Sequence, residues 1–239
     1  GIAYAKKGDI EKAIDTYEKA IALNPSDAIA YNNLGVVYDK MGDYEKAIDT
    51  YEKAIALNPY DAKPFYNLGF AYFRKGDILK SLIHIQKALN LQPKDQEFVG
   101  FGLSIIVNHQ QWPYLIQFHE KWTGNKPFSS ILGESLYRVI KENKNNKFFY
   151  FKTTFDSIRT FDFININEVI NGLCLGLYKD GGLNFLRQVV DELSHDFADD
   201  AFVQINLEVY KYLLNPEGKD INQLHPDVRT VVESIIQEE

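Results

Sequence analysis

The sequence contains one cysteine, Cys174, among its 239 residues. A single thiol excludes an intramolecular disulfide bond and a metal site built from several cysteines. We expect Cys174 to be a small core residue, because it lies within the apolar stretch 172–178. Such sparse use of cysteine favours a reducing compartment, and we therefore expect a cytoplasmic protein.

Long hydrophobic runs are also missing. No stretch of 18 residues is continuously apolar, and this excludes a membrane-spanning helix of the usual kind. The chain does not open with a basic segment followed by a short apolar one, so no secretory signal is visible. The composition, 45% hydrophobic and 25% charged, is that of a globular protein.

Motifs that carry enzyme chemistry are missing as well. The five histidines have no metal-ligand spacing, and no serine lies in a nucleophile-elbow pattern. Gly100 and Gly102 fall inside an apolar helical stretch, so they do not form a phosphate-binding loop. We therefore expect no catalytic residue, no cofactor and no metal, that is, a protein that is not an enzyme.

The charge pattern bears on the class of partner. The net charge is −7, and residues 191–239 carry 12 acidic and 3 basic side chains. An acidic surface is repelled by the phosphate backbone, so we do not expect nucleic acid as the main ligand.

What the sequence does contain is a repeat with a period of 34 residues. Residues 42–59, GDYEKAIDTYEKAIALNP, copy residues 8–25, GDIEKAIDTYEKAIALNP, and only Ile10 and Tyr44 differ. A fixed period of this length is typical of stacked-repeat proteins, in which each unit packs only on its neighbours.

Apolar and small residues recur at positions 4, 7, 8, 11, 20, 24, 27 and 32 of each unit. In the unit that begins at Ala28 they are Tyr31, Leu34, Gly35, Tyr38, Ala47, Tyr51, Ala54 and Pro59. In the unit that begins at Ala62 they are Phe65, Leu68, Gly69, Tyr72, Ser81, Ile85, Ala88 and Pro93. The first four positions predict one helical stripe and the next three a second. A Gly-Asp pair lies between them, where Gly closes one helix and Asp opens the next.

This pattern resembles the tetratricopeptide repeat (TPR) family, strongly over residues 1–93 and weakly over 94–127. The resemblance implies an all-α fold, a right-handed α-solenoid of stacked antiparallel helix pairs that become degenerate toward the C-terminus. In the weak fourth unit the expected core residues, at positions 4, 11, 20, 24 and 27, are Val99, Ile106, Leu115, His119 and Trp122. Gly1 falls at position 8, in the middle of a first helix, so we expect a fragment of a longer protein.

Beyond residue 127 only a helical rhythm remains. We expect helices at about 129–143, 147–161, 166–179, 183–197, 200–214 and 225–238. The breaks between them are expected at 144–146, 181–182, 198–200 and 215–218. We divide the chain into residues 1–93, which hold the repeats with the first one truncated, and residues 94–239. The second part is either a run of degenerate helix pairs or a separate all-helical domain.

In the family that the chain resembles, the first helices line a concave surface that binds a partner, with positions 2, 5, 6, 9, 12 and 13 pointing into it. Apolar residues that point away from the core are the informative ones there. The expected peptide-binding residues are Asn32, Asn33, Val36, Lys63, Tyr66, Asn67, Phe70, Phe73, Arg74 and Phe101. Many family members use Asn at position 6 to hold a peptide backbone, and the resemblance implies this role for Asn33 and Asn67.

We therefore expect a protein-interaction scaffold or adaptor that binds a peptide segment of a partner in this groove. Family members that bind chaperones grip a C-terminal carboxylate with Lys at position 5 and Asn at position 9. Here those positions hold Asn32 and Val36, or Tyr66 and Phe70, so we do not expect an acidic C-terminal tail as the ligand.

Two other interpretations stay open. The chain could be the regulatory or substrate-recruiting arm of a larger enzyme whose catalytic domain lies outside these 239 residues. It could also self-associate through its truncated first repeat, because such an end exposes apolar surface.

Overall fold

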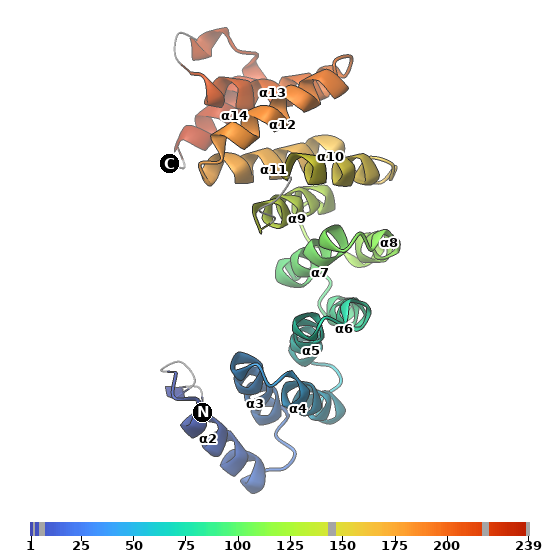
Figure 1. The fold of residues 1–239 in the computed structure, drawn as a ribbon, viewed down its shortest axis with the longest axis vertical. Coiled ribbons are helices and arrows are strands. Elements are labelled where there is room, and N and C mark those ends of the chain that lie inside the picture. The colour runs from blue at the N-terminus through green and yellow to red at the C-terminus, as the bar shows by residue number, and fades with distance from the viewer. Residues whose placement is uncertain (2, 5–7, 143–146, 217–219, 238–239) are drawn as a thin grey trace. The chain divides into compact units, whose positions relative to one another are not determined.

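A computed structural model describes residues 1, 3–4, 8–142, 147–216 and 220–237. Within these residues the chain forms thirteen α-helices and one short 3-10 helix, and it contains no strand. The expected all-α class is therefore confirmed. The chain divides into two compact units, Gly1–Asn125 (unit 1) and Lys126–Glu239 (unit 2) (Figure 1).

Unit 1 is a stack of antiparallel helix pairs (Figure 1). Its helices are α2 (Ile10–Leu23), α3 (Ala28–Met41), α4 (Tyr44–Leu57), α5 (Ala62–Lys75), α6 (Ile78–Leu91), α7 (Gln96–Asn108) and α8 (Trp112–Lys121). The pairs are α3 with α4, α5 with α6, and α7 with α8, and each pair packs on the next. This compact unit extends past residue 93, because α7 packs on α6.

The Gly-Asp pairs form the tight turn inside each helix pair. Gly42 and Gly76 have positive φ angles of 82° and 88°, which a residue without a Cβ adopts at no steric cost. Asp43 and Asp77 follow as N-caps, and each side chain accepts the backbone N–H three residues later, at 3.2 and 3.1 Å. The roles expected for both residues of the pair are confirmed.

Small residues at position 8 let the two helices of a pair touch. A Cβ added at Gly35 would lie 2.5 Å from the ring of Tyr51, and one added at Gly69 would lie 2.7 Å from Ile85. Neither distance is tolerable between real atoms. The helices therefore approach until a large side chain on the second helix covers the bare backbone of the first.

The fourth pair departs from the expected register. Three of its predicted core residues are buried: Val99, Ile106 and Leu115. However, Phe118 fills the core in place of His119, and a Cβ at Gly102 would lie 2.1 Å from the Phe118 ring. Trp122, which falls at position 27 in place of a small Ala, follows the end of α8 as its C-cap and lies outside the helix. The equivalent Ala54 is fully buried, and an indole does not fit that space.

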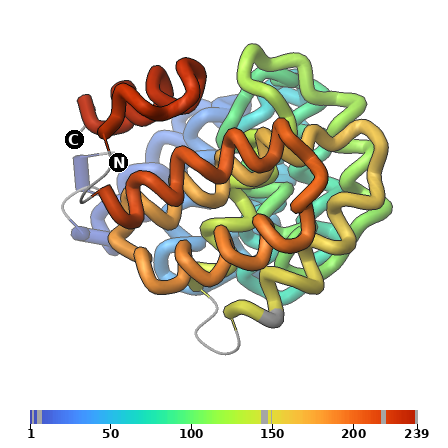
Figure 2. Tube along the Cα trace, turned by 90° about the horizontal axis from the view of Figure 1, so that it is seen from above, coloured from blue at the N-terminus to red at the C-terminus, as the bar shows by residue number. Residues whose placement is uncertain are grey.

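Unit 2 contains the remaining helices. They are α9 (Phe128–Glu142), α10 (Lys147–Ile158), α11 (Ile166–Lys179), α12 (Leu183–Asp196), α13 (Ala201–Leu214), the 3-10 helix η1 (Ile221–Gln223) and α14 (Pro226–Gln237). The six helices expected here are confirmed to within three residues at each end. The break expected at 144–146 lies outside the described residues, as do residues 217 and 218 of the last break. In Figure 2, α12 and α13 run side by side in orange.

Helices α9 and α11 are in contact although α10 separates them in the sequence. A Cβ at Gly133 would lie 2.2 Å from the carbonyl oxygen of Val169, and one at Gly172 would lie 2.6 Å from that of Ser130. The two backbones therefore touch directly. Cys174, also on α11, is fully buried as predicted, and burial raises the pKa of its thiol.

Replacing Gly133 by Ala should separate α9 from α11, because its Cβ would overlap a backbone carbonyl that cannot move alone. We expect the free energy of unfolding to fall by about 1–3 kcal/mol, measured by urea denaturation. Gly182→Ala is the control, since a Cβ there would come no closer than 3.3 Å to its neighbours. Equal losses in the two variants would contradict the close contact.

Candidate protein-binding face

The predicted site residues lie on three consecutive first helices of unit 1, and we call their surface the first-helix face. Helix α3 contributes Asn32, Asn33 and Val36, α5 contributes Lys63, Tyr66, Asn67, Phe70, Phe73 and Arg74, and α7 contributes Phe101. Eight of the ten are half-buried, whereas Lys63 and Arg74 are exposed. Half-burial leaves part of each side chain open to a ligand.

Four aromatic rings form one cluster on this face. The ring of Phe101 lies 5.3 Å from Phe70, 5.5 Å from Phe73 and 5.7 Å from Tyr66, between ring centroids. Tilted and edge-on contacts at these distances are favourable between aromatic rings. The cluster links α5 to α7, so it provides a continuous apolar strip across two helix pairs.

The two position-6 asparagines differ in their contacts. The Asn67 side-chain nitrogen donates a 2.9 Å hydrogen bond to the side-chain oxygen of Asn32 on the preceding first helix. This bond restrains the orientation of the Asn67 amide and does not use its carbonyl oxygen. Asn33 is half-buried, and its side chain forms no hydrogen bond with the part of the chain that the structure describes.

Arg74 is held in place at one edge of the face. Its Nε donates a 3.2 Å hydrogen bond to the hydroxyl of Tyr44, and its guanidinium lies 5.6 Å above the Tyr44 ring and 5.9 Å from the Phe70 ring. A cation over an aromatic ring is attracted to its face. Burial raises the pKa of Asp39, and the positive charge of Arg74 partly opposes that rise.

The remaining two predicted residues have different surroundings. Val36 packs against the core cluster that contains Ala47 and Leu68, so it forms the floor of the face more than its surface. Lys63 projects outward, and within the described ranges its ammonium group forms no ion pair. Its backbone N–H belongs to the cap of α5, where it donates to Asp61 at 3.0 Å.

Three neighbours of the face are absent from the expected site residues, although Glu97 falls at position 2 of the fourth unit, which is one of the positions expected to point into the groove. Phe98 stacks on Tyr66 with ring centroids 4.7 Å apart, and Glu97 accepts a 3.1 Å hydrogen bond from the Tyr66 hydroxyl. The ring of His109 lies edge-on to Phe73 at 6.1 Å. Phe98 could have been predicted from the sequence, because it adds an aromatic residue beside position 4 of the fourth unit. No sequence signal pointed to His109, which lies after the end of α7.

On the second helices, His84 occupies an unusual environment. Its ring stacks on Tyr72, with centroids 5.4 Å apart and ring planes inclined by 13°. Burial, followed by the charges of Lys87 and Lys80, lowers the pKa of His84 to about 4. Its Nδ1 is buried without a hydrogen-bond partner in the described residues. The imidazole is therefore neutral at pH 7 and acts as an aromatic packing group.

The lowered pKa of His84 predicts a pH-dependent stability. The unfolded histidine binds a proton near pH 6.5, whereas the folded one does so only near pH 4. The free energy of unfolding should therefore fall as the pH drops from about 6.5 to about 4, and His84→Gln should reduce that fall. His195→Gln is the control, because that side chain is 90% exposed. The same pH dependence in His84→Gln and the parent chain would contradict the prediction.

Across residues 8–142, 147–216 and 220–237, no three His, Cys, Asp or Glu side chains gather closely enough to hold a metal ion. No helix in the same ranges has the length and hydrophobicity needed to cross a membrane.

Models of known protein families match the N-terminal part of the chain. Residues 1–42 match a family model described as TPR repeat, and residues 28–61 and 50–82 match two models described as tetratricopeptide repeat. No curated protein matches the chain.

Several solved structures resemble it. The crystal structure of MamA has 22% sequence identity and a TM-score of 0.48, and the match covers 66% of this chain and 94% of that one. MamA 41-end from Desulfovibrio magneticus RS-1 has 24% identity and a TM-score of 0.39, covering 68% and 73% of the two chains. The MamA RS-1 ArsTM double mutant has 27% identity and a TM-score of 0.44, covering 51% and 70%.

Proposed function

Because residues 1–82 are tetratricopeptide repeats, we propose that the chain is a protein-interaction scaffold, not an enzyme, and that its first-helix face binds a peptide segment of a partner. The main support for this proposal is the half-buried aromatic cluster around Phe101, which lies outside the core stripes of α5 and α7. Aromatic residues on a surface are the usual energetic centres of protein interfaces. The buried Cys174 fits a reducing, cytoplasmic setting.

The chemistry of the face suggests how such a segment would be held. An apolar side chain of the peptide would pack on Phe70 and Phe101, which gains free energy by leaving water. The Asn67 amide, oriented by its bond to Asn32, would hydrogen-bond the peptide backbone. Arg74, at the edge, would favour an acidic side chain within the segment.

An acidic C-terminal tail is not part of this proposal. Such a tail needs cationic and amide donors at positions 5 and 9, where this chain has Tyr66 and Phe70. The Tyr66 hydroxyl donates to the carboxylate of Glu97, which places a negative charge where the tail would add another.

The first test removes the two central contacts. We expect Phe70→Ala to weaken partner capture roughly tenfold or more, as for a central aromatic of an interface, and Asn67→Ala to weaken it a few-fold. The immobilised chain is the bait, and captured proteins are quantified by mass spectrometry. Tyr60→Ala and Asn90→Ala are the matched controls, since both residues are exposed and lie off the face. Unchanged capture by both Phe70→Ala and Asn67→Ala would move the site elsewhere.

A second test concerns the free carboxylate. A synthetic peptide that ends in Glu-Val-Asp should bind no more tightly than its C-terminally amidated form, because the face has no donor set for that carboxylate. Isothermal titration calorimetry with both peptides measures the difference. Tight binding that is lost on amidation would be the opposite of the expected result.

A further inference from the structure

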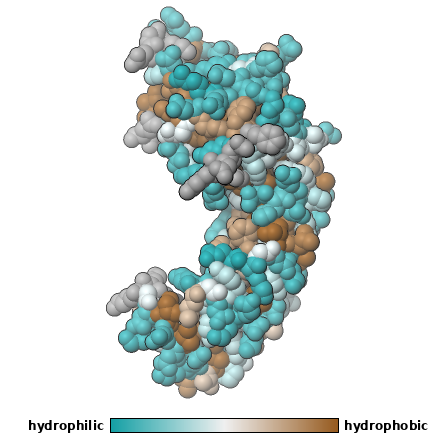
Figure 3. All heavy atoms as spheres, in the orientation of Figure 1, coloured by the Kyte–Doolittle hydropathy of each residue, from teal (hydrophilic) through white to brown (hydrophobic). Residues whose placement is uncertain are grey.

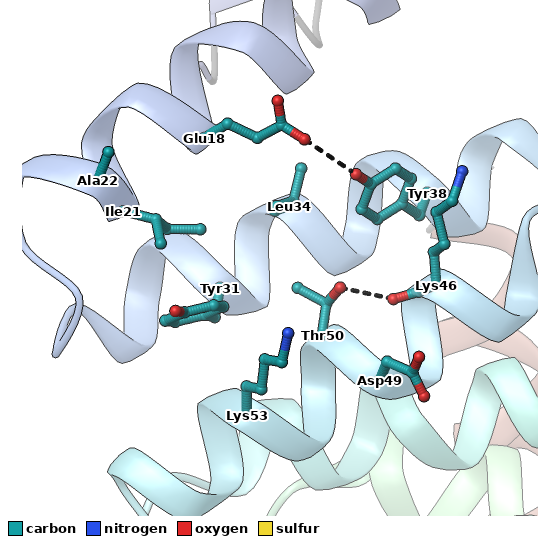
Figure 4. Close-up of a pocket in the computed structure, with 10 residues that line it drawn as sticks. All are labelled: Glu18, Ile21, Ala22, Tyr31, Leu34, Tyr38, Lys46, Asp49, Thr50 and Lys53. Carbon is teal, nitrogen blue, oxygen red and sulfur yellow. Dashed lines mark hydrogen bonds between the residues drawn. The ribbon is translucent and has the colours of Figure 1, made fainter.

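A second surface feature lies between α2, α3 and α4. It is a cleft of about 430 Å³ that shares no residue with the first-helix face. Figure 4 shows Ile21 of α2, Tyr31 and Tyr38 of α3, and Thr50 and Lys53 of α4 arranged around it. The volume is within the range of about 300–1,000 Å³ that small ligands and anchoring side chains occupy.

In the next repeat unit a larger side chain occupies the position that is equivalent to Thr50. Each residue of the cleft has a counterpart 34 positions later, and the counterpart of Thr50 is His84. The His84 ring stacks on Tyr72, which is the counterpart of Tyr38, with 5.4 Å between ring centroids. The protein's own sequence therefore places an aromatic ring at this position of the repeat.

Around the cleft this ring is missing. The Thr50 hydroxyl donates to the carbonyl oxygen of Lys46, at 2.5 Å, and so points back to its own helix. Among the described residues no aromatic ring stacks on Tyr38. Its ring packs against core residues and has the Lys46 ammonium 5.4 Å from its centroid, and its hydroxyl donates to the carboxylate of Glu18 at 3.4 Å. The stacked ring of His84 in the next unit therefore has no counterpart on Tyr38, where Thr50, which is 7% exposed, lines the cleft in its place.

Lys53 adds a polar contact. Its counterpart Lys87 lies over the ring of Phe65, at 5.9 Å, but in the described residues Lys53 makes neither an ion pair nor a ring contact. In Figure 4 its ammonium group faces the space between Tyr31 and Thr50. A hydrogen-bond donor is thus present beside the position of the missing ring.

We propose that this cleft binds a tyrosine side chain of a partner segment. The ring stacks on Tyr38 as His84 stacks on Tyr72, and the phenol oxygen accepts a hydrogen bond from the Lys53 ammonium. An aromatic residue supplies much apolar area and a defined geometry to such an anchor. The site is separate from the first-helix face and gives the scaffold a second point of attachment.

The experiment uses N-acetyl-tyrosinamide as the probe, with saturation-transfer NMR on the full chain. Binding should be detected with the parent chain and lost in Thr50→His, whose imidazole fills the cleft. Thr16→His is the matched control, because it makes the same change one repeat earlier, outside the cleft, and should keep binding. Lys53→Met should lower the affinity for N-acetyl-tyrosinamide. The lowered affinity should equal that of the parent chain for N-acetyl-phenylalaninamide, which lacks the hydroxyl.

The reciprocal variant, His84→Thr, tests the proposal even if Thr50→His does not fold. His84→Thr should open the equivalent place in the next unit and increase the saturation-transfer signal of the probe relative to the parent chain. Asn67→Ala with Phe70→Ala should leave probe binding unchanged, which separates this site from the first-helix face. Equal binding in the parent chain, Thr50→His and Lys53→Met, or no binding in the parent chain, would overturn the proposal.

Discussion

The contact on which unit 1 depends is that of a bare glycine backbone with a large side chain. Gly35 meets Tyr51 and Gly69 meets Ile85, at distances where no Cβ fits. This contact sets the spacing of the two helices in a pair, and the spacing in turn fixes which residues of the first helix remain outside the core. Asn67 and its neighbours are not part of this glycine contact, and they form the first-helix face.

The residues that build the stack could be read from the sequence, because they obey strong local rules. Gly-Asp pairs end and start helices through φ angles and caps, which depend on only a few neighbouring residues. The fourth pair could not be read in the same way. There Phe118 is buried in the core instead of His119, and its ring packs on the bare backbone of Gly102 on the other helix. A contact between two helices of this kind cannot be predicted from local sequence rules. The Asn67–Asn32 bond, between residues 35 apart, likewise requires the stack to be known first.

Of the two surfaces proposed to bind partners, the cleft combines residues of the core stripes, such as Tyr38, with residues that differ between units, such as Thr50. In Figure 3 most of the visible surface is hydrophilic, and hydrophobic side chains interrupt it over the part of unit 1 that contains α2. Thr50 and His84 each precede a core residue, Tyr51 or Ile85, that covers the glycine of the facing helix in its own unit. Binding surfaces can therefore differ between two units that share the same fold and the same glycine contact.

The burial of Cys174 gives the molecule an internal reporter. It is the only thiol in the chain, it lies buried on α11, and burial raises its pKa so that it stays protonated near neutral pH. A thiol reagent can modify it only when that part of unit 2 opens, so the modification rate follows the local opening equilibrium of unit 2 alone. The stability of one unit can thus be followed by chemistry while the other unit contributes no signal.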